Sequence, residues 1–118
     1  MRHKTYSLQG HGLEEPVTRF VYNFWQQAHE SVYEGGFIRV FEEYSWLNSN
    51  RMVVCLRLDT GRAAQGEVEL EIIAGGAGGG FFFSFNWGTE RRRIRHFEKE
   101  LLVFCKANHI NVEVVREG

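Results

Sequence analysis

Residues 67–73 read Glu-Val-Glu-Leu-Glu-Ile-Ile, and this stretch decides the fold class. Apolar and acidic residues alternate in it, so that one side of an extended chain is apolar and the other is charged. The apolar set is Val68, Leu70 and Ile72, and the acidic set is Glu67, Glu69 and Glu71. Such alternation is typical of an antiparallel strand with one face on a core and one face in water. We therefore predict a sheet that is covered on one side.

Further strands are predicted on both sides of this stretch. They are rich in aromatic and β-branched residues, and several are separated by turn residues. The predicted strands span residues 4–9, 37–46, 51–59 and 81–87, and the pattern leaves open whether residues 110–115 join the sheet.

The glycine run at residues 75–80 breaks the strand pattern. A phosphate-binding loop would lead directly into a helix, but this run leads into aromatic residues. We expect a flexible hairpin or bulged strand ends, with a mobile lid over a pocket as the alternative.

Two amphipathic helices are predicted. The first begins at Glu14-Glu15-Pro16, where acids suit the helix dipole, and continues to the stop at Gly35-Gly36. The second follows the N-cap Thr89, begins at Glu90 and ends near Ala107, with Asn108 as a left-handed cap. Each helix carries one apolar face that needs a sheet to cover.

The element order is therefore β-α-β-β-β-β-α, with a further strand at the end left open. Short loops between strands predict antiparallel pairing, and two helices of this kind suit one face of the sheet. We predict an α+β, two-layer single domain over residues 1–118, which resembles TATA-binding-protein-like and Bet v 1-like folds. On the uncovered face we expect Phe37, Phe41, Val53 and Phe82 among charged residues, a composition that favours a partner.

The composition fits a folded protein inside the cell. Of the 118 residues, 43% are hydrophobic and 14% aromatic, which can offset the chain entropy lost on folding. No apolar run is long enough for a secretory leader or a membrane span. Cys55 and Cys105 stand far apart in apolar patterns, as reduced core thiols do. We expect a cytoplasmic protein without a membrane partner.

Arg91, Arg92, Arg93 and Arg95 form the most unusual charge cluster. They occupy the first turns of the second predicted helix, where positive charge opposes the helix dipole. One interpretation is a solvated face whose arginines pair with Glu98 or with glutamates of the sheet. The other is an anion site for a phosphorylated or carboxylated ligand.

A second candidate region is the polar and aromatic cluster around the predicted turn at residues 48–50. Its side chains could line the mouth of a pocket or an interface, or they could form an ordinary exposed hairpin. The candidates are Tyr44, Trp46, Asn48, Asn50 and Arg51, together with Gly76 and Gly78 of the glycine run.

Catalytic and metal-binding patterns are absent from the sequence. The five histidines form no HxH or HExxH motif, and fourteen glutamates offer no distinct acid–base pair. We expect no cofactor, no metal and no catalytic residue. The net charge of -1 and the acidic face of residues 67–73 disfavour a nucleic-acid partner.

Two segments resemble a family of small uncharacterised bacterial domains. The first, residues 40–51, contains Val-Phe-Glu-Glu-Tyr-Ser and Asn-Ser-Asn-Arg. The second, residues 73–83, contains Ile-Ala-Gly-Gly followed by three phenylalanines. The resemblance covers the middle third of the chain. It implies a small cytoplasmic bacterial α+β domain, and it transfers no catalytic residue because the family has no established activity.

These observations lead to two functional hypotheses. The first is a small non-enzymatic binding or protein-interaction module that forms a homodimer through a sheet face or edge. The alternative is a carrier of an anionic or apolar small molecule, with a pocket between sheet and helix.

Overall fold

A computed structural model describes residues 1–24, 28–45, 50–77 and 86–118 of the chain. Its elements, in chain order, are β1 (Arg2–Gln9), α1 (Glu14–Phe24), β2 (His29–Tyr33), β3 (Gly36–Ser45), β4 (Asn50–Asp59), the short 3-10 helix η1 (Ala63–Gln65), β5 (Glu67–Ala77), α2 (Asn86–Ala107) and β6 (Asn111–Glu117). The α+β class and the predicted order of elements are confirmed.

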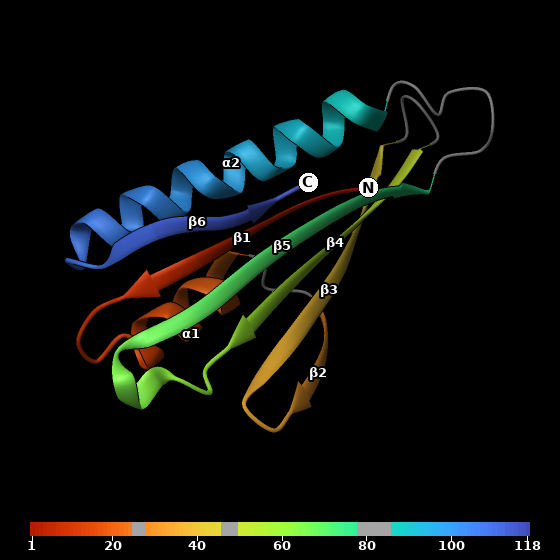
Figure 1. Ribbon diagram of the computed structural model, residues 1–118. Coiled ribbons are helices and arrows are strands. Elements are labelled where there is room, and N and C mark those ends of the chain that lie inside the picture. Colours follow the sequence, from red (N-terminus) through yellow and green to blue (C-terminus); the bar gives the residue numbers. More distant parts are fainter. Residues whose placement is uncertain (25–27, 46–49, 78–85) are drawn as a thin grey trace.

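The strands form one antiparallel sheet in the order β2-β3-β4-β5-β1-β6 (Figure 1). The first four are successive neighbours in the chain, as their short connections predict. The N-terminal strand β1 then pairs with β5, and β6 pairs with β1, so that β2 and β6 are the two edges. The C-terminal strand therefore joins the sheet, which the sequence left open.

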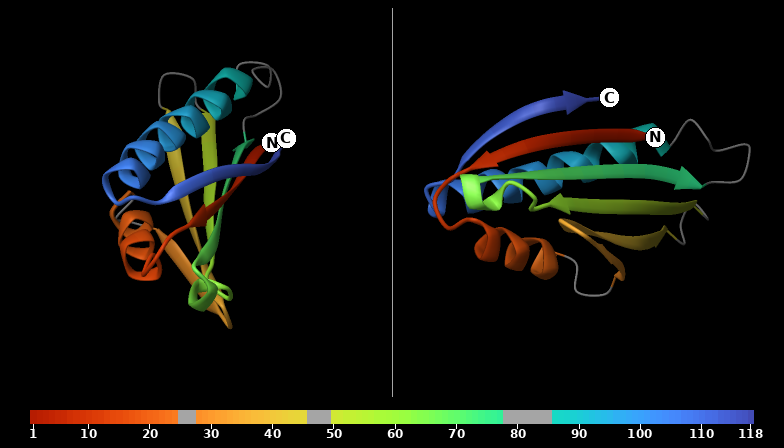
Figure 2. Two further views of the ribbon diagram at one scale, coloured as in Figure 1. Left: turned by 60° about the vertical axis from the view of Figure 1, so that its left-hand side comes forward. Right: turned by 60° about the horizontal axis from the view of Figure 1, so that its bottom comes forward.

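Both helices lie on the same face of the sheet, as predicted (Figure 2, left). The core between the layers is built from the alternating apolar residues of the strands and one face of each helix. Its largest fully buried side chains include Tyr6 and Phe97, whose ring centroids lie 6.3 Å apart. The predicted apolar face of α2 is confirmed, since Ile94, Phe97 and Leu101 are buried.

The first helix is shorter than predicted. It ends at Phe24, and His29–Tyr33 forms the edge strand β2 instead of continuing the helix. A buried arginine satisfies carbonyl groups of the last turn of α1: Arg39 of β3 donates hydrogen bonds to the carbonyl oxygens of Val21 and Tyr22, at 3.4 and 3.1 Å. A guanidinium at this position also complements the helix dipole. Beyond the helix, β2 pairs with β3 through a turn at Gly35 with φ 91°.

Strand β5 continues through Gly75 and Gly76 to Ala77, where the sequence predicted a break. Backbone pairing explains this, because Gly75 and Gly76 lie opposite Val53 and Met52 of β4 and need no side chain to do so. The predicted strand at residues 81–87 falls mostly outside the described residues. Its last two residues, Asn86 and Trp87, belong to α2 and not to a strand.

The ends of α2 also differ from the prediction. The helix begins at Asn86, so Thr89 lies inside it and is not the N-cap. At the other end His109, with φ 57°, takes the left-handed conformation predicted for Asn108. The Asn108 side chain instead donates a hydrogen bond to the Phe104 carbonyl oxygen. In the described part of the chain, no helix is both long and apolar enough to cross a membrane.

The uncovered face of the sheet is less apolar than predicted. Phe37 and Phe41 pair with Leu58 and Val54 and are buried on the helix-covered face, because the alternation of β3 places them there. Val53, one residue out of step with Val54, lies on the uncovered face, and Phe82 falls outside the described residues. The expectation of an aromatic outer surface is therefore wrong for both described phenylalanines.

Candidate functional site

A hollow of about 310 Å³ lies between the first half of α2 and the adjoining ends of β1 and β6. Three parts of the chain that are far apart in sequence meet there because β1 pairs with β6 at the sheet edge beside α2 (Figure 2, right). Its lining residues are Arg2, His3, Lys4, Arg91, Ile94, Arg95, Glu98, Glu117 and Gly118. We call this site the cationic hollow.

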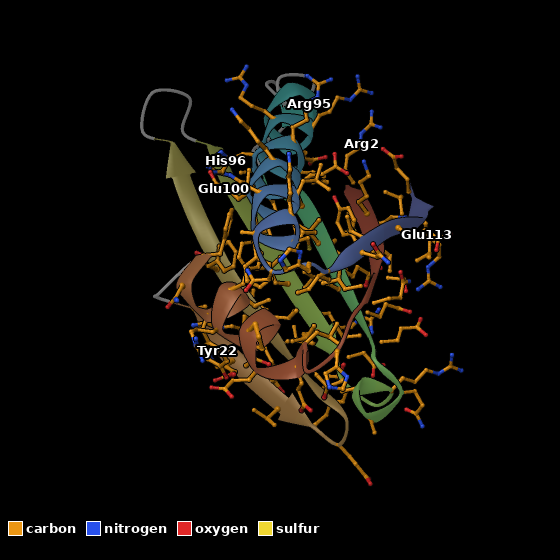
Figure 3. All side chains as sticks on the ribbon, turned by 90° about the vertical axis from the view of Figure 1, so that its left-hand side faces the viewer. Arg2, Tyr22, Arg95, His96, Glu100 and Glu113 are labelled. Atoms are coloured by element: carbon orange, nitrogen blue, oxygen red, sulfur yellow. The ribbon has the colours of Figure 1, made fainter. Side chains whose placement is uncertain are left out.

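Helical spacing explains which α2 side chains reach the hollow. Arg91, Arg95 and Glu98 follow one another at intervals of about one helical turn, so they share a face of the helix. Figure 3 shows Arg95 of α2 and Arg2 of β1 at the same end of the molecule, whereas His96 and Glu100 lie on the other side of the helix. Two of the four predicted anion-binding arginines, Arg91 and Arg95, thus line the hollow together with Arg2.

Lys4 organises the floor of the hollow. Its ammonium nitrogen lies 2.7 Å from Glu98 and 3.6 Å from Glu117, and its side chain is only 14% exposed. Burial of Tyr6, together with the neighbouring Glu98 carboxylate, raises the pKa of the Tyr6 hydroxyl far above its ordinary value, so that it stays protonated. Lys4 thus pairs with both acidic side chains of the hollow, Glu98 and Glu117.

Arg2, Arg91 and Arg95 are not compensated in this way. Within the described residues none of the three has a carboxylate within ion-pair distance, and Glu98 binds Lys4 and not an arginine. The hollow thus brings together four cationic side chains and two carboxylates, in a chain whose total charge is -1. A local excess of positive charge attracts anions.

His3 also lines the hollow, but the alternation of β1 places its side chain on the uncovered face, with Thr5 and Ser7 and away from Arg2 and Lys4. Its Nδ1 is shielded from solvent and has no hydrogen-bond partner among the described residues. Its backbone is fixed, because His3 and Gly118 exchange two hydrogen bonds of 2.9 Å.

The other two predicted arginines do not line the hollow. Arg92 is exposed, while Arg93 is half-buried and makes contacts of its own. Whether any of the four binds an anion remains a prediction.

The second predicted region is only partly described. Trp46, Asn48 and Gly78 fall outside the described residues. The backbones of the others lie at one end of the sheet: Tyr44 opposite Arg51, Asn50 opposite Ser45, and Gly76 opposite Met52. Their register places the residues close together, and a role as a pocket mouth or interface stays a prediction.

A second arginine cluster occupies the uncovered face of the sheet, and its charges are matched. Arg57 of β4 contacts Glu69 at 2.7 Å and Glu71 at 3.1 Å, and Arg116 of β6 contacts Glu69 at 3.1 Å. Burial opposes ionisation of Glu71, but the Thr5 hydroxyl and the Arg57 guanidinium outweigh it and hold the pKa of Glu71 below its ordinary value. We call this the Arg57 cluster.

The sequence did not indicate Arg2 or Lys4 as site residues. They become part of the hollow through the pairing of β1 with β5 and β6, in which Arg2 lies opposite Ala74 and Lys4 lies opposite Ile72 and Glu117. No local motif signals such pairing. The alternation of β1 and of residues 110–115 was the only hint that these segments belong to the sheet.

The two cysteines lie on opposite sides of the sheet. Cys105 is buried on α2, and burial raises its pKa to about 11. Cys55 of β4 is half-buried on the uncovered face and is not the core residue that the sequence predicted. Both are free thiols. Among the described residues, no three His, Cys, Asp or Glu side chains group as metal ligands would.

A family model matches residues 26–104, about two thirds of the chain. The chain belongs to the family of unknown function DUF6054. This confirms the resemblance to a domain of unknown function that the middle of the sequence suggested. The DUF6054 match includes Arg91 and Arg95 but neither β1 nor β6, so the cationic hollow combines the matched segment with both flanking strands. No curated protein and no solved structure matches the chain, and the two fold likenesses stay predictions.

Proposed function

We propose that the protein is a small non-enzymatic binding module that recognises an anionic group in the cationic hollow. The observation that carries this proposal is the set of three arginines, Arg2, Arg91 and Arg95, which face one hollow without a carboxylate partner among the described residues. Like charges repel one another, so gathering them raises the energy of the empty site. A bound anion would relieve that repulsion.

The chemistry of the lining favours phosphate or carboxylate. A guanidinium group presents paired N–H donors that match two oxygens of such a group. Lys4 is already paired with Glu98 and Glu117, which leaves the arginines as the groups available to a ligand.

Calorimetric titration with inorganic phosphate at low ionic strength tests this proposal. We expect Arg95→Gln to weaken phosphate binding about 10-fold, the loss of one charge-assisted hydrogen bond. Arg92→Gln is the matched control, because Arg92 lies on the same helix, is exposed and does not line the hollow. Equal effects of the two variants, or no binding by the wild type, would refute the proposal.

A second candidate function is self-association as a protein-interaction module. The observation that favours it is the edge strand β2, whose five residues are all exposed, with Val32 at 73%. An open edge offers unpaired backbone groups to another strand. Sedimentation of the wild type and Val32→Lys tests this: a dimer that the lysine disperses supports the homodimer, and a monomeric wild type excludes it.

We also propose that the protein works in the reducing cytoplasm of a bacterium. The two free thiols support this location, since cysteines at separate sites stay reduced there. Fractionation of the source cells tests it, and recovery outside the cytoplasm would contradict it.

A further inference from the structure

Exposed apolar side chains follow the lining of the cationic hollow along α2 and β6. Leu102 follows Glu98 by about one helical turn and so lies on the same face of α2 as Arg95. It is 45% exposed. On β6, Val114 and Val112 lie opposite Tyr6 and Leu8 of β1, which places them on the helix-covered face of the sheet. Val114 is also 45% exposed, while Val112 is half-buried against the core. We call Leu102, Val112 and Val114 the apolar strip.

The polar and apolar parts follow one another along the two elements. On α2, the arginines of the hollow precede Leu102, and on β6 the valines precede Glu117. The loop after α2 turns the chain back, since the amide of Ile110 donates to the Cys105 carbonyl oxygen. The helix and the strand thus run in opposite directions (Figure 1). The end of α2 that carries Arg91 and Arg95 therefore lies beside the end of β6 that carries Glu117, and the apolar residues of both elements follow on the side away from the arginines.

From this arrangement we infer that the ligand of the proposed site is an amphiphilic anion: a single molecule with a phosphate or carboxylate head and an alkyl chain. The inference rests on the proposed function and adds the chemical class of the ligand. The anionic head of the ligand would contact Arg2, Arg91 and Arg95, and its alkyl chain would cover Leu102 and Val114. The hollow of about 310 Å³ has room for the headgroup.

A single amphiphile fits this surface better than a membrane does. Glu98 and Glu117 lie beside the arginines, within the same lining. A broad anionic bilayer would meet these carboxylates as well as the guanidinium groups, and like charges repel. One headgroup of limited size can contact the arginines, and its alkyl chain passes Glu98, whose charge is already paired with Lys4.

The inference is tested by calorimetric titration of the full chain with three probes: inorganic phosphate, n-octyl phosphate below its micelle-forming concentration, and n-octanol. Each methylene that leaves water tightens binding about four-fold, so burial of three predicts that octyl phosphate binds roughly 50-fold tighter than phosphate. We expect octanol to bind far more weakly than octyl phosphate, because it lacks the charge.

Two variants of α2 test where the alkyl chain of octyl phosphate binds. Leu102→Ser should remove most of the advantage of octyl phosphate over phosphate and leave phosphate binding unchanged. Val103→Ser is the matched control: Val103 is 63% exposed on the same helix, but on a different face. Since both side chains are exposed, neither substitution should prevent folding, and circular dichroism checks this.

The outcomes separate this inference from the proposed function. Arg95-dependent phosphate binding without an octyl advantage overturns the amphiphile and leaves the anion site standing. No binding of any probe overturns both. Equal binding of octanol and octyl phosphate, or binding to anionic vesicles but not to monomeric octyl phosphate, also overturns the inference. So does a dimer that Leu102→Ser disperses, because the apolar strip would then be an interface between copies.

Discussion

The molecule carries two arginine clusters that differ in how their charge is balanced. In the Arg57 cluster, on the uncovered face, each arginine contacts at least one carboxylate, and Arg57 is only 24% exposed. In the cationic hollow, Arg2, Arg91 and Arg95 have no carboxylate partner among the described residues. Arginine thus occurs in two settings: matched charges hold strands together, and in our proposal the unmatched charges of the hollow bind a ligand.

The largest expected effect is a difference in stability between a variant of the Arg57 cluster and a variant of the cationic hollow. Arg57→Met leaves Glu69 and Glu71 without their main partner, and we expect it to lower the free energy of unfolding by about 2 kcal/mol, a value reduced for partial exposure. Arg95→Met removes an unpaired charge and should change the free energy of unfolding by less than about 0.5 kcal/mol. Urea unfolding of both variants measures the difference, and equal losses would show that the distinction between the clusters is wrong.

Acid should weaken the Arg57 cluster. The folded pKa of Glu71 lies below its ordinary value of 4.5, so its ionised form stabilises the fold above that value. This stabilisation is lost as the pH falls through the lowered folded pKa. In urea unfolding at about pH 7 and about pH 3, Glu71→Gln should therefore show a smaller loss of stability on acidification than the wild type. Arg95→Met serves as the control and should lose as much as the wild type; a Glu71→Gln variant with the full acid loss would contradict the assignment.

The smallest expected effect is that of salt. Arg91 and Arg95 are exposed, so phosphate binding in the hollow should weaken several-fold between about 0.01 M and about 0.15 M salt. The stability loss of Arg57→Met should vary less over that range, because the Arg57 contacts are short and partly buried. Titrations and unfolding curves at both concentrations test this. An affinity for phosphate that does not change with the salt concentration would argue against an electrostatic site.

Much of the fold was predictable because its signals are local. The alternation at residues 67–73 indicated a sheet with one covered face, and the spacing of Ile94, Phe97 and Leu101 indicated the helix that covers it. The contact of Arg39 with the last turn of α1 was not predictable, because Arg39 approaches from a strand that pairs elsewhere in the chain. Local propensity carries no trace of such a contact.

The candidate site was half predictable for the same reason. The run of arginines opposed the helix dipole and so marked Arg91 and Arg95 as unusual. Arg2 and Lys4 carried no signal, since only the pairing of β1 with β5 and β6 brings them to α2. The assignment of Phe37 and Phe41 to the uncovered face was wrong. A shift of one residue in the assumed alternation of a strand moves every side chain to the opposite face.

The most direct test of the central claim is a titration of the isotope-labelled protein with inorganic phosphate, followed by the chemical shifts of its backbone amides. If the cationic hollow binds the anion, the largest changes should fall on the amides around Arg2 and Lys4 in β1 and around Arg91 and Arg95 in α2, and Arg95→Gln should diminish them. Changes centred on Arg57 and Glu69, or none at saturating phosphate, would contradict the account.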